Sequence, residues 1–400
     1  MHAPATLPDA ALSPLALEDA VTLPTYAKPP VALVRGENAT VWDTDGRAYL
    51  DLYGGHCVAL LGHSPPRVVE AIRRQAGELL FYSNAMYSPV RARAAEALAA
   101  LAPEGLGRVF WCNSGTEANE TALKLARTFT GRTGVVAMHG GFHGRTLGSL
   151  AATSGEGYRR PYRAILPETR FVPFGWEGAV EEALAAGDVA AVLLEPIQSM
   201  AGVYEAPARY YRALRTLCDR YGALLVFDEV QTGVGRTGRF LFGEHVGVVP
   251  DLVTLAKSLG AGVPVGAVLV SEAVAATVRS GDQGTTFGGG MLAMAAVAAT
   301  LAELVEADLM PRAERLFAAF AEALAAVPAV RALRGRGGLL GVALDRPARP
   351  VVAALRARGI LVGGADEPHT IRLMPPLTTP LGAADAFARA LADATAEHVQ

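Results

Sequence analysis

Seven short, mostly apolar runs lie between residues 108 and 271, and the stretches between them have the composition of helices. Apolar runs without alternation are typical of strands that are buried on both faces of a parallel sheet. Strands that alternate with helices build an α/β arrangement, in which helices cover both faces of the sheet. The chain is therefore predicted to contain a mostly parallel, seven-stranded sheet in a large domain. Its expected strands are residues 108–112, 134–139, 170–174, 189–195, 223–229, 252–257 and 264–271.

Further strands flank this pattern at both ends. Residues 39–43 and 47–51 alternate around an Asp-Gly turn, which predicts an N-terminal β-hairpin. Residues 339–345 and 370–374, with helical stretches on both sides, indicate a smaller α+β domain. Because 400 residues exceed what one hydrophobic core usually supports, we expect separate domains. The expected division is an arm and hairpin of the small domain over residues 1–60, the large domain over 61–300 and the rest of the small domain over 301–400.

The charge pattern argues against several function classes. A formal net charge of −3, with the 36 basic residues spread along the chain, disfavours a nucleic-acid or membrane surface and favours small-molecule partners. Three cysteines without a CxxC pair, no apolar run of membrane-spanning length and no leader-like start predict a cytoplasmic protein. His139 and His143 are four residues apart, but Gly140 and Gly141 disfavour a helix there, so no metal site is expected.

Two charged residues stand at the ends of two predicted core strands. Asp228 follows the apolar residues 224–227, and Lys257 follows the run 252–256. A buried charge is costly unless it is paired, so the two side chains suggest a ligand that needs both. Pyridoxal 5'-phosphate is such a ligand, because its aldehyde forms a Schiff base with a lysine amine and its ring nitrogen needs a carboxylate to stay protonated.

Other segments have residues that suit parts of this cofactor. Ser114, Gly115 and Thr116 follow a strand and open a helix, which suits a phosphate, although on its own an ordinary helix cap is the preferred interpretation. Residues 283–290 form a second cluster of hydroxyls and glycines, which could bind the phosphate from another side or serve as a linker. Residues 233–238 match GxGxxG, yet no helix follows the glycines, so a dinucleotide site is not expected.

Taken together, these segments resemble the class III pyridoxal phosphate aminotransferases, most closely the branch of acetylornithine and ornithine aminotransferases. The resemblance runs from about residue 41 to residue 377, and the motifs occur in the family's order. It implies fold type I of the pyridoxal-phosphate-dependent transferases. The motifs are NSGTEANETALKLAR, GFHGRTLGSL, LLEPIQ, LLVFDEVQTGVGRTG, LVTLAKSLGAGVPVGA and GTTFGG.

The resemblance implies roles for the residues that would bind the cofactor. Lys257 would hold it covalently and later shuttle a proton between substrate and cofactor, while Asp228 would pair with the ring nitrogen. Thr286 of a neighbouring subunit would reach the phosphate, so a homodimer with a shared active site is implied. The remaining contacts would come from Gln231 to the ring oxygen, Phe142 against the ring, and Ser114, Gly115 and Thr116 to the phosphate.

For the substrates, an amine donor and an oxo-acid acceptor, the resemblance implies two arginines. Arg145 would bind one substrate carboxylate beside Thr285, and Arg372 would bind the α-carboxylate of glutamate. In the family, a glutamate shortly after EPIQ masks the second arginine, but methionine stands at position 200 here. Arg372 is therefore expected to stay unmasked, or to pair with another acid such as Asp366 or Glu367.

His56 is a second departure, because the family commonly has an apolar or aromatic residue there that faces the substrate. We expect His56 to hydrogen-bond an acyl or carboxyl group, or merely to fill space. The expected enzyme is an ω-aminotransferase of arginine biosynthesis, which moves the terminal amine of N-acetylornithine, or of a related acylated ornithine or lysine, to 2-oxoglutarate. The products would be a semialdehyde and glutamate. The alternatives are transamination of 4-aminobutyrate or another ω-amine, a racemase or aminomutase reaction on the same fold, and a cofactor-binding protein without activity.

Overall fold

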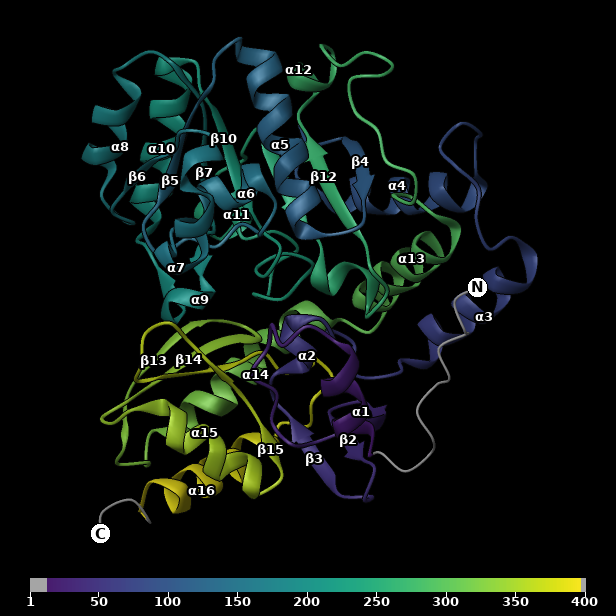
Figure 1. Ribbon diagram of the computed structural model, residues 1–400, viewed down its shortest axis with the longest axis vertical. Coiled ribbons are helices and arrows are strands. Elements are labelled where there is room, and N and C mark those ends of the chain that lie inside the picture. The colour runs from purple at the N-terminus through teal and green to yellow at the C-terminus, as the bar shows by residue number, and fades with distance from the viewer. Residues whose placement is uncertain (1–12, 397–400) are drawn as a thin grey trace, which may run out of the picture.

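The computed structural model describes residues 13–396, which form four β-sheets surrounded by helices (Figure 1). The largest sheet has seven strands in the order β4-β12-β11-β10-β7-β5-β6. Strand β12 is antiparallel to both of its neighbours, whereas the pairs from β11 to β6 are parallel. The predicted mostly parallel, seven-stranded sheet is confirmed. Its strands are β4 (Arg108–Cys112), β5 (Gly134–Met138), β6 (Arg170–Val172), β7 (Val189–Leu194), β10 (Leu224–Asp228), β11 (Leu252–Leu255) and β12 (Gly266–Val270).

The two charged residues that were expected on strand tips take different places. Asp228 is the last residue of β10, as predicted. Strand β11 already ends at Leu255, and Lys257 is the first residue of the 3₁₀ turn η2 (Lys257–Gly260). The prediction that Lys257 ends a strand is therefore wrong, because the backbone leaves the strand at Ala256 and bends before the lysine.

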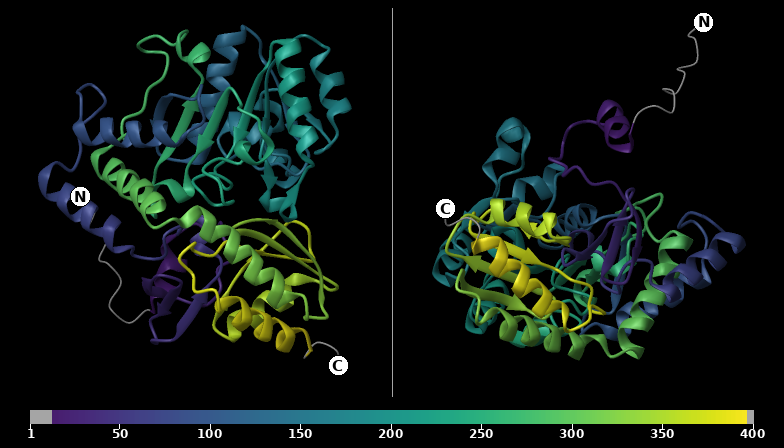
Figure 2. Two further views of the ribbon diagram at one scale, coloured as in Figure 1. Left: turned by 180° about the vertical axis from the view of Figure 1, so that it is seen from behind. Right: turned by 90° about the horizontal axis from the view of Figure 1, so that it is seen from below.

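Each face of the large sheet carries its own hydrophobic core, because successive residues of a strand point to opposite faces. Val226 lies in the core that contains α5 (Gly115–Thr130). Its neighbour Phe227 lies in the other core, with residues of α10 (Ala208–Tyr221). Helices consequently cover both faces of the sheet (Figures 1 and 2). The other helices of this lobe are α3 (Pro66–Glu78), α4 (Pro89–Leu101), α6 (Leu147–Ala152), α7 (Glu156–Arg159), η1 (Arg160–Ile165), α8 (Glu177–Leu184), α11 (Gly243–Val246), α12 (Glu272–Ala275) and α13 (Met291–Glu306).

A second lobe is built from both ends of the chain (Figure 2). The predicted hairpin is confirmed as β2 (Thr40–Asp43) and β3 (Ala48–Asp51), and the predicted C-terminal strands as β14 (Leu339–Leu344) and β17 (Thr370–Leu373). Strand β15 (Ile360–Leu361), which was not predicted, pairs in parallel with β3. The domain boundaries stay a prediction. Further elements are α1 (Pro14–Val21), β1 (Leu33–Glu37), α2 (Gly54–Cys57), α14 (Leu309–Leu324), β13 (Val330–Arg336), α15 (Ala348–Ala357), β16 (Gly363–Gly364) and α16 (Ala383–Ala396).

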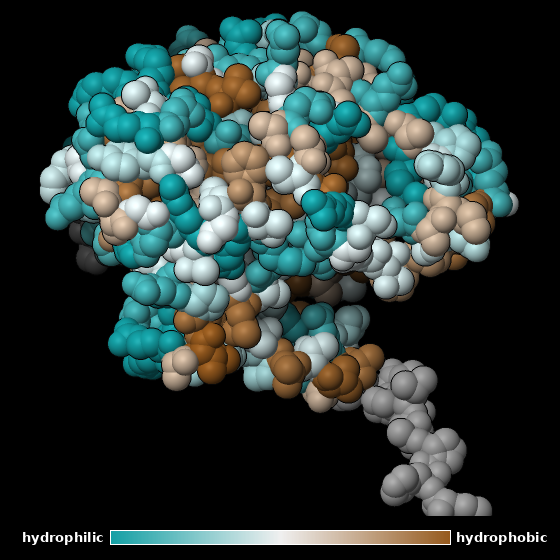
Figure 3. All heavy atoms as spheres, turned by 90° about the horizontal axis from the view of Figure 1, so that it is seen from above, coloured by the Kyte–Doolittle hydropathy of each residue, from teal (hydrophilic) through white to brown (hydrophobic). Residues whose placement is uncertain are grey.

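A short sheet of β8 (Ile197–Gln198) and β9 (Tyr204–Glu205) encloses α9 (Ser199–Gly202). In Figure 1, α9 lies where the two lobes meet. The face of the molecule in Figure 3 is mainly hydrophilic, with apolar residues gathered in separate patches. Within residues 13–396, none of the helices is both long and apolar enough to cross a membrane.

Candidate active site

A cavity of about 440 Å³ lies at the carboxyl end of β10, next to the turn that follows β11. The crevice outside the carboxyl ends of strands is where open α/β sheets usually bind ligands. The structure brings most of the predicted site residues to this cavity, although they come from four separate segments of the chain. The lining includes Ser114, Gly115, Thr116, Phe142, Arg145, Asp228, Gln231 and Lys257.

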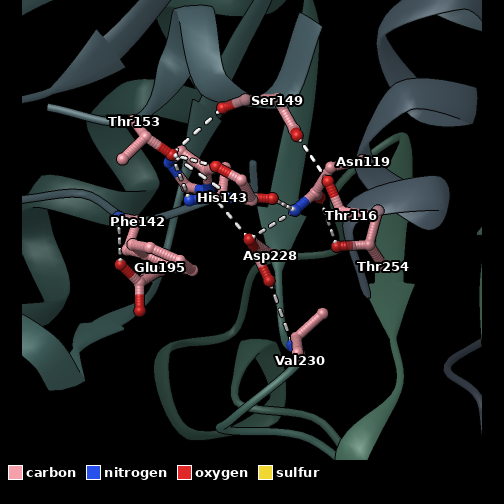
Figure 4. Close-up of polar contacts among 11 residues, drawn as sticks. Thr116, Asn119, Phe142, His143, Ser149, Thr153, Glu195, Asp228, Val230 and Thr254 are labelled. Atoms are coloured by element: carbon pink, nitrogen blue, oxygen red, sulfur yellow. Dashed lines mark hydrogen bonds and ion pairs between the residues drawn. The ribbon is translucent and has the colours of Figure 1, made fainter. Parts of the chain in front are cut away.

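Three hydrogen bonds fix the Asp228 carboxylate, which is only 3% exposed (Figure 4). Its Oδ2 accepts bonds from Nδ1 of His143 and Nδ2 of Asn119, both at 2.7 Å. Its Oδ1 accepts the backbone N–H of Val230 at 3.1 Å. Asn119 is itself held by Thr254, whose hydroxyl donates to Oδ1 of Asn119 at 2.8 Å. The carboxylate is thus rigidly oriented, and it keeps acceptor capacity for a cationic ring nitrogen.

The sequence interpretation missed Asn119 and His143 as parts of this site. His143 was considered only as a metal ligand. Asn119 lies within a predicted helix of which only the spacing of the apolar residues was considered. A signal for Asn119 was present, because it directly follows Ala118 on the buried side of α5. A buried amide needs partners, so a polar residue on that face predicts a polar network underneath.

Lys257 is buried beside the carboxylates. Burial lowers the pKa of its amine, and the nearby Cys57, Asp228 and Glu195 act against this shift. A lysine with a lowered pKa is a better nucleophile and a better base near neutral pH. The Lys257 amine is therefore suited both to bonding an aldehyde and to accepting a proton.

The start of α5 forms a cradle of hydroxyl groups and backbone amides, which are the groups that a phosphate needs. Ser114 caps the helix, since its hydroxyl accepts the N–H of Glu117 at 3.3 Å. The Thr116 hydroxyl contacts Oγ of Ser149 at 2.5 Å and Oγ1 of Thr146 at 2.9 Å. A Cβ at Gly144 would lie 2.1 Å from Oγ1 of Thr116, so only glycine lets the two loops approach. Free amides and the dipole at this helix end favour an anion.

Phe142 and Glu195 form one wall of the cavity, where the backbone N–H of Phe142 donates to Oε1 of Glu195 at 2.8 Å. Glu195 was not predicted as a site residue. Burial raises the pKa of its carboxyl to about 7. On the same side, the exposed Arg145 holds its guanidinium 3.6 Å from the ring centre of Tyr158.

Gln231 carries a buried Oε1 that has no hydrogen-bond partner within residues 13–396. A buried polar atom without a partner is costly in a folded chain, so a ligand atom is the natural partner for this amide. Side-chain amides present both a donor and an acceptor: the N–H groups can donate to an oxygen on a cofactor ring, and the amide oxygen can accept from a ligand group that carries a hydrogen.

Arg372 lies on β17 and is 2% exposed. Its Nε donates to the carbonyl of Gly364 at 2.5 Å and its Nη1 to Oγ of Ser199 at 3.1 Å. The predicted alternative, a pair with Asp366 or Glu367, is wrong. Glu367 instead accepts hydrogen bonds from Thr370 and His369. Among the described residues, no ion pair joins Arg372 to a carboxylate, which leaves a buried cation available to a substrate anion.

His56 sits in an unusual stretch of backbone, because residues 54–57 all have φ between 56° and 71°. For residues other than glycine, the left-handed conformation costs roughly 1–2 kcal/mol each. The Asp51 carboxylate holds the turn by accepting the N–H groups of Tyr53, Gly54 and Gly55 at 2.9–3.1 Å. His63 fixes Asp51 in turn, with Nε2 2.7 Å from Oδ2. We call residues 54–57 the left-handed turn.

Thr285 and Thr286 do not line the 440 Å³ cavity of their own chain. Oγ1 of Thr285 accepts Nδ2 of Asn113, a cavity residue, at 3.3 Å. Thr285 lines a separate cavity of about 490 Å³ near Asn84 and Tyr87. Thr286 is exposed. The predicted contacts of these two threonines therefore stay predictions that need a second subunit.

Comparisons with known proteins identify the family. The model of the class III aminotransferases matches residues 23–395. Acetylornithine aminotransferase of Methanopyrus kandleri is 48% identical over 327 residues, which cover 82% of this chain and 84% of that protein. The enzyme of the same name from Mycolicibacterium smegmatis is 45% identical over 376 residues, 93% of this chain and 95% of that protein.

Solved structures agree with this relationship. The ornithine aminotransferase of Toxoplasma gondii, crystallised with pyridoxal phosphate at partial occupancy, superimposes with a TM-score of 0.90 at 32% identity, covering 96% of this chain and 95% of that chain. N-acetylornithine aminotransferase of Stenotrophomonas maltophilia gives a TM-score of 0.80 at 35% identity, covering 94% and 98%. The fold is therefore that of the pyridoxal-phosphate-dependent enzymes of fold type I, and the chain belongs to the class III aminotransferase family.

Proposed function

We propose that this aminotransferase moves the terminal amino group of N-acetylornithine, or of a related acylated ornithine or lysine, to 2-oxoglutarate. The products are a semialdehyde and glutamate, and arginine biosynthesis is the expected pathway. The observation that carries the proposal is the set of relatives named acetylornithine aminotransferase, which are 42–48% identical over most of the chain. Aminotransferases of class III use pyridoxal phosphate, which carries the amino group between the two substrates and withdraws electrons from the reacting carbon.

The residues of the cavity fit this cofactor. The Ser114–Thr116 segment offers amides and hydroxyls to the phosphate, and Gly144 keeps that cradle open. Asp228, held by His143 and Asn119, would keep the ring nitrogen protonated. The Gln231 amide could donate a hydrogen bond from its Nε2 to a ring oxygen, while its buried Oε1, unpaired within residues 13–396, can accept one from a ligand donor. Phe142 would cover one side of the ring.

Lys257 carries the proton transfer in this proposal. Its Nζ would hold the cofactor between turnovers and, once released by an incoming amine, take the proton from the carbon that bears the amino group. The lowered pKa that burial gives to this amine keeps a share of it unprotonated near neutral pH, as a base requires.

Two arginines supply the charge that substrate carboxylates need. Arg372 is buried without a carboxylate partner among the described residues, and its charge acts on Lys257 and His56. Arg145 is exposed at the rim of the cavity. The dicarboxylate 2-oxoglutarate would satisfy both cations, because guanidinium groups bind carboxylates in a bidentate manner.

A substrate panel tests this function. Purified holoenzyme is assayed with 2-oxoglutarate and, in turn, N-acetylornithine, ornithine and 4-aminobutyrate, and glutamate formation is measured. The highest kcat/KM is expected for N-acetylornithine. Negligible turnover of N-acetylornithine beside good turnover of 4-aminobutyrate would contradict the substrate. Reaction of an amino acid without consumption of the oxo acid would point to a racemase instead.

The same proposal includes a homodimer, which we place in the cytoplasm. Support comes from apolar side chains that the single chain leaves exposed, because exposed apolar clusters mark interaction surfaces. Phe287 is 65% exposed and packs 5.2 Å from the ring of Phe81, and Met86 and Tyr87 are exposed nearby in the chain. Thr286, next to Phe287, would then reach the phosphate of the partner.

Sedimentation of the purified protein tests the dimer, and a Thr286→Ala variant tests the shared site. Loss of one hydrogen bond to phosphate is expected to weaken cofactor affinity by about 3- to 10-fold without dissociating the dimer. A monomer in solution, or unchanged cofactor affinity in the variant, would contradict this part.

A further inference from the structure

Glu195 places a second carboxyl group beside Asp228 at the edge of the large sheet. In the parallel pair β7–β10, Val226 lies opposite Leu193, and both residues belong to the core that contains α5. Asp228 and Glu195 come two residues after them, and residues two apart face the same side of a strand. Neighbouring strands lie about 5 Å apart, so the two acids extend from adjacent strand ends. Both line the 440 Å³ cavity, as this placement requires.

The two carboxyl groups differ in their hydrogen bonds (Figure 4). Asp228 uses both oxygens, and its three donors are all groups of the protein. Glu195 uses Oε1 alone, which accepts the backbone N–H of Phe142 at 2.8 Å. Its Oε2 makes no hydrogen bond to any residue in the range 13–396. Because Glu195 is only 4% exposed and lines the cavity, this oxygen is available to a ligand that enters there.

The amine donor brings a proton for which the site needs an acceptor. A primary amine has a pKa of about 10, so the donor arrives as an ammonium ion without a free lone pair. Lys257 is then bonded to the cofactor in the proposed function, and Asp228 pairs with the ring nitrogen. His143 is buried and donates to Asp228, and the guanidinium of Arg145 can only donate. Of the titratable residues that line the cavity, only Glu195 is left.

We propose that Glu195 is the catalytic base that binds the ammonium group of the incoming amine donor and takes one of its protons on Oε2. The N–H bond of the ammonium breaks, its electron pair stays on the nitrogen, and an O–H bond forms on Glu195. The proton then passes to solvent. A buried carboxylate is a strong partner for an ammonium ion, because the surroundings screen the charges less than water does. Only the identity of the donor rests on the proposed function.

The surroundings of Glu195 give its carboxyl the acidity of a base that works near neutral pH. Burial raises its pKa to about 7; His143, the N–H of Phe142 and Lys257 act against this shift, and the charge of Asp228 adds to it. A base is most effective when its pKa lies near the working pH, because it is then partly ionised and still able to hold a proton.

The pH dependence of kcat/KM in Glu195→Gln tests the proton transfer. Glutamine keeps the bond from Phe142 but takes no proton, so kcat/KM at pH 7 is expected to fall by about 100-fold or more. The variant can use only the uncharged amine, whose share rises about tenfold per pH unit. Its kcat/KM should therefore climb up to about pH 9, while that of wild type levels off above about pH 7. An equal loss at every pH would mean a structural role and would overturn the proposal.

Glu229→Gln is the matched control, because Glu229 is also buried and burial raises its pKa to about 7. It does not line the cavity. Its oxygens accept hydrogen bonds from Thr232, Phe242 and Gly243. This variant is expected to keep the wild-type pH profile. If it shows the same climb as Glu195→Gln, the effect comes from losing any buried acid, and the assignment to Glu195 is wrong.

Calorimetry measures the contact without turnover. Borohydride reduction fixes the cofactor to Lys257, so the reduced holoenzyme binds glutamate as an amine donor without converting it. Titrations in buffers of different ionisation enthalpy give the number of protons released. The ammonium group displaces the proton of Glu195, so wild type is expected to release about half a proton at pH 7 and almost none at about pH 8.5. Glu195→Gln should release none, and Glu229→Gln should behave as wild type. Equal release from Glu195→Gln and wild type would overturn the proposal.

Two donors separate this inference from the proposed function. The pH profiles are measured with N-acetylornithine and, in the reverse half-reaction, with glutamate, because both arrive as ammonium ions. Wild type that does not turn over N-acetylornithine but shows the expected profile and proton release with glutamate would contradict only the proposed function. Wild type whose kcat/KM keeps climbing above pH 7 with both donors would overturn the role of Glu195.

Discussion

At the scale of single residues, the site depends on charges that neighbouring groups hold in fixed states. Asp228 accepts hydrogen bonds from three donors, whereas the Lys257 amine makes no hydrogen bond to any residue in the range 13–396 and is influenced through burial and charge. Hydrogen bonds thus hold the Asp228 carboxylate in place, whereas none of them holds the Lys257 amine. This division suits a carboxylate that supports a ring and a lysine that transfers protons.

Replacing Lys257 by alanine tests whether this residue transfers the proton while other residues hold the cofactor. Turnover is expected to fall by at least about 100-fold, the lower end for loss of a general base. The cofactor should still bind, because the cradle at the start of α5 and the Asp228 carboxylate remain. Steady-state assays measure the first result and absorbance of the dialysed protein the second. Turnover at a normal rate would refute the role of Lys257.

The position of Asp228 was predictable, because it ends a continuous apolar run that can only be a core strand. The strand before Lys257 was predicted to end two residues later than it does, because a continuous run of apolar residues does not reveal that the backbone leaves the strand at Ala256. Asn119 and His143 were missed for another reason. They meet Asp228 across 109 and 85 residues of chain, and such pairings follow from the packing of helix on sheet rather than from local patterns.

At the scale of elements, the loop of residues 141–146 and the start of α5 act as one unit. Thr116 bonds to Thr146 and Ser149, and Oε1 of Glu120 accepts the N–H groups of Gly148 and Ser149 at 2.8 and 3.0 Å. The loop that carries Phe142 is therefore tied to the segment that would hold the phosphate. A shift in one of them must move the other.

Gly144→Ala is expected to break this unit. At φ 140° the added Cβ would meet Oγ1 of Thr116 at 2.1 Å and Oγ of Ser149 at 2.5 Å, so the cradle must deform. Cofactor affinity, measured by titrating the apoenzyme, is expected to fall by about tenfold or more. Gly77→Ala in α3 is the control, because its Cβ meets nothing within 4 Å and alanine favours a helix. Equal affinities in both variants would disprove the coupling.

Elements with a clear pattern of apolar residues or a recognisable turn could be predicted from the sequence, and elements without such a pattern could not. The seven core strands and the hairpin follow from apolar runs and an Asp-Gly turn. Strands β15 and β16 have only two residues each, and β16 consists of two glycines, so no pattern could reveal them. The left-handed turn was equally hidden, because its conformation is imposed by Asp51 and His63 and not by its own residues.

At the scale of the whole molecule, buried carboxyls link folding to pH. Burial raises the pKa of Glu195 and that of Glu229 to about 7. Since an unfolded glutamate titrates near 4.3, the folded apoprotein binds more protons between about pH 4.5 and 7. Their contribution to stability is present at low pH and is lost as the pH rises through about 7. His56 acts in the opposite sense, because its folded pKa of about 4 lies below the unfolded value.

The Glu195→Gln variant isolates the contribution of Glu195 to the pH dependence of stability. Glutamine can still accept the N–H of Phe142 but has no proton to lose. Between about pH 5.5 and 7.5, the urea midpoint of the variant apoprotein is expected to fall less than that of wild type. Parallel curves for the two proteins would mean that Glu195 titrates normally in the folded chain.

The pairing of β3 with β15 joins residues about 310 positions apart, with Leu50 opposite Ile360. Until the ribosome has released nearly the entire polypeptide, the edge of the N-terminal hairpin has no neighbour and stays open to pairing with other nascent chains. Closing so large a loop is slow compared with forming local contacts. We therefore expect the second lobe to be the last part to assemble during synthesis, and this edge to be where aggregation of newly made protein begins.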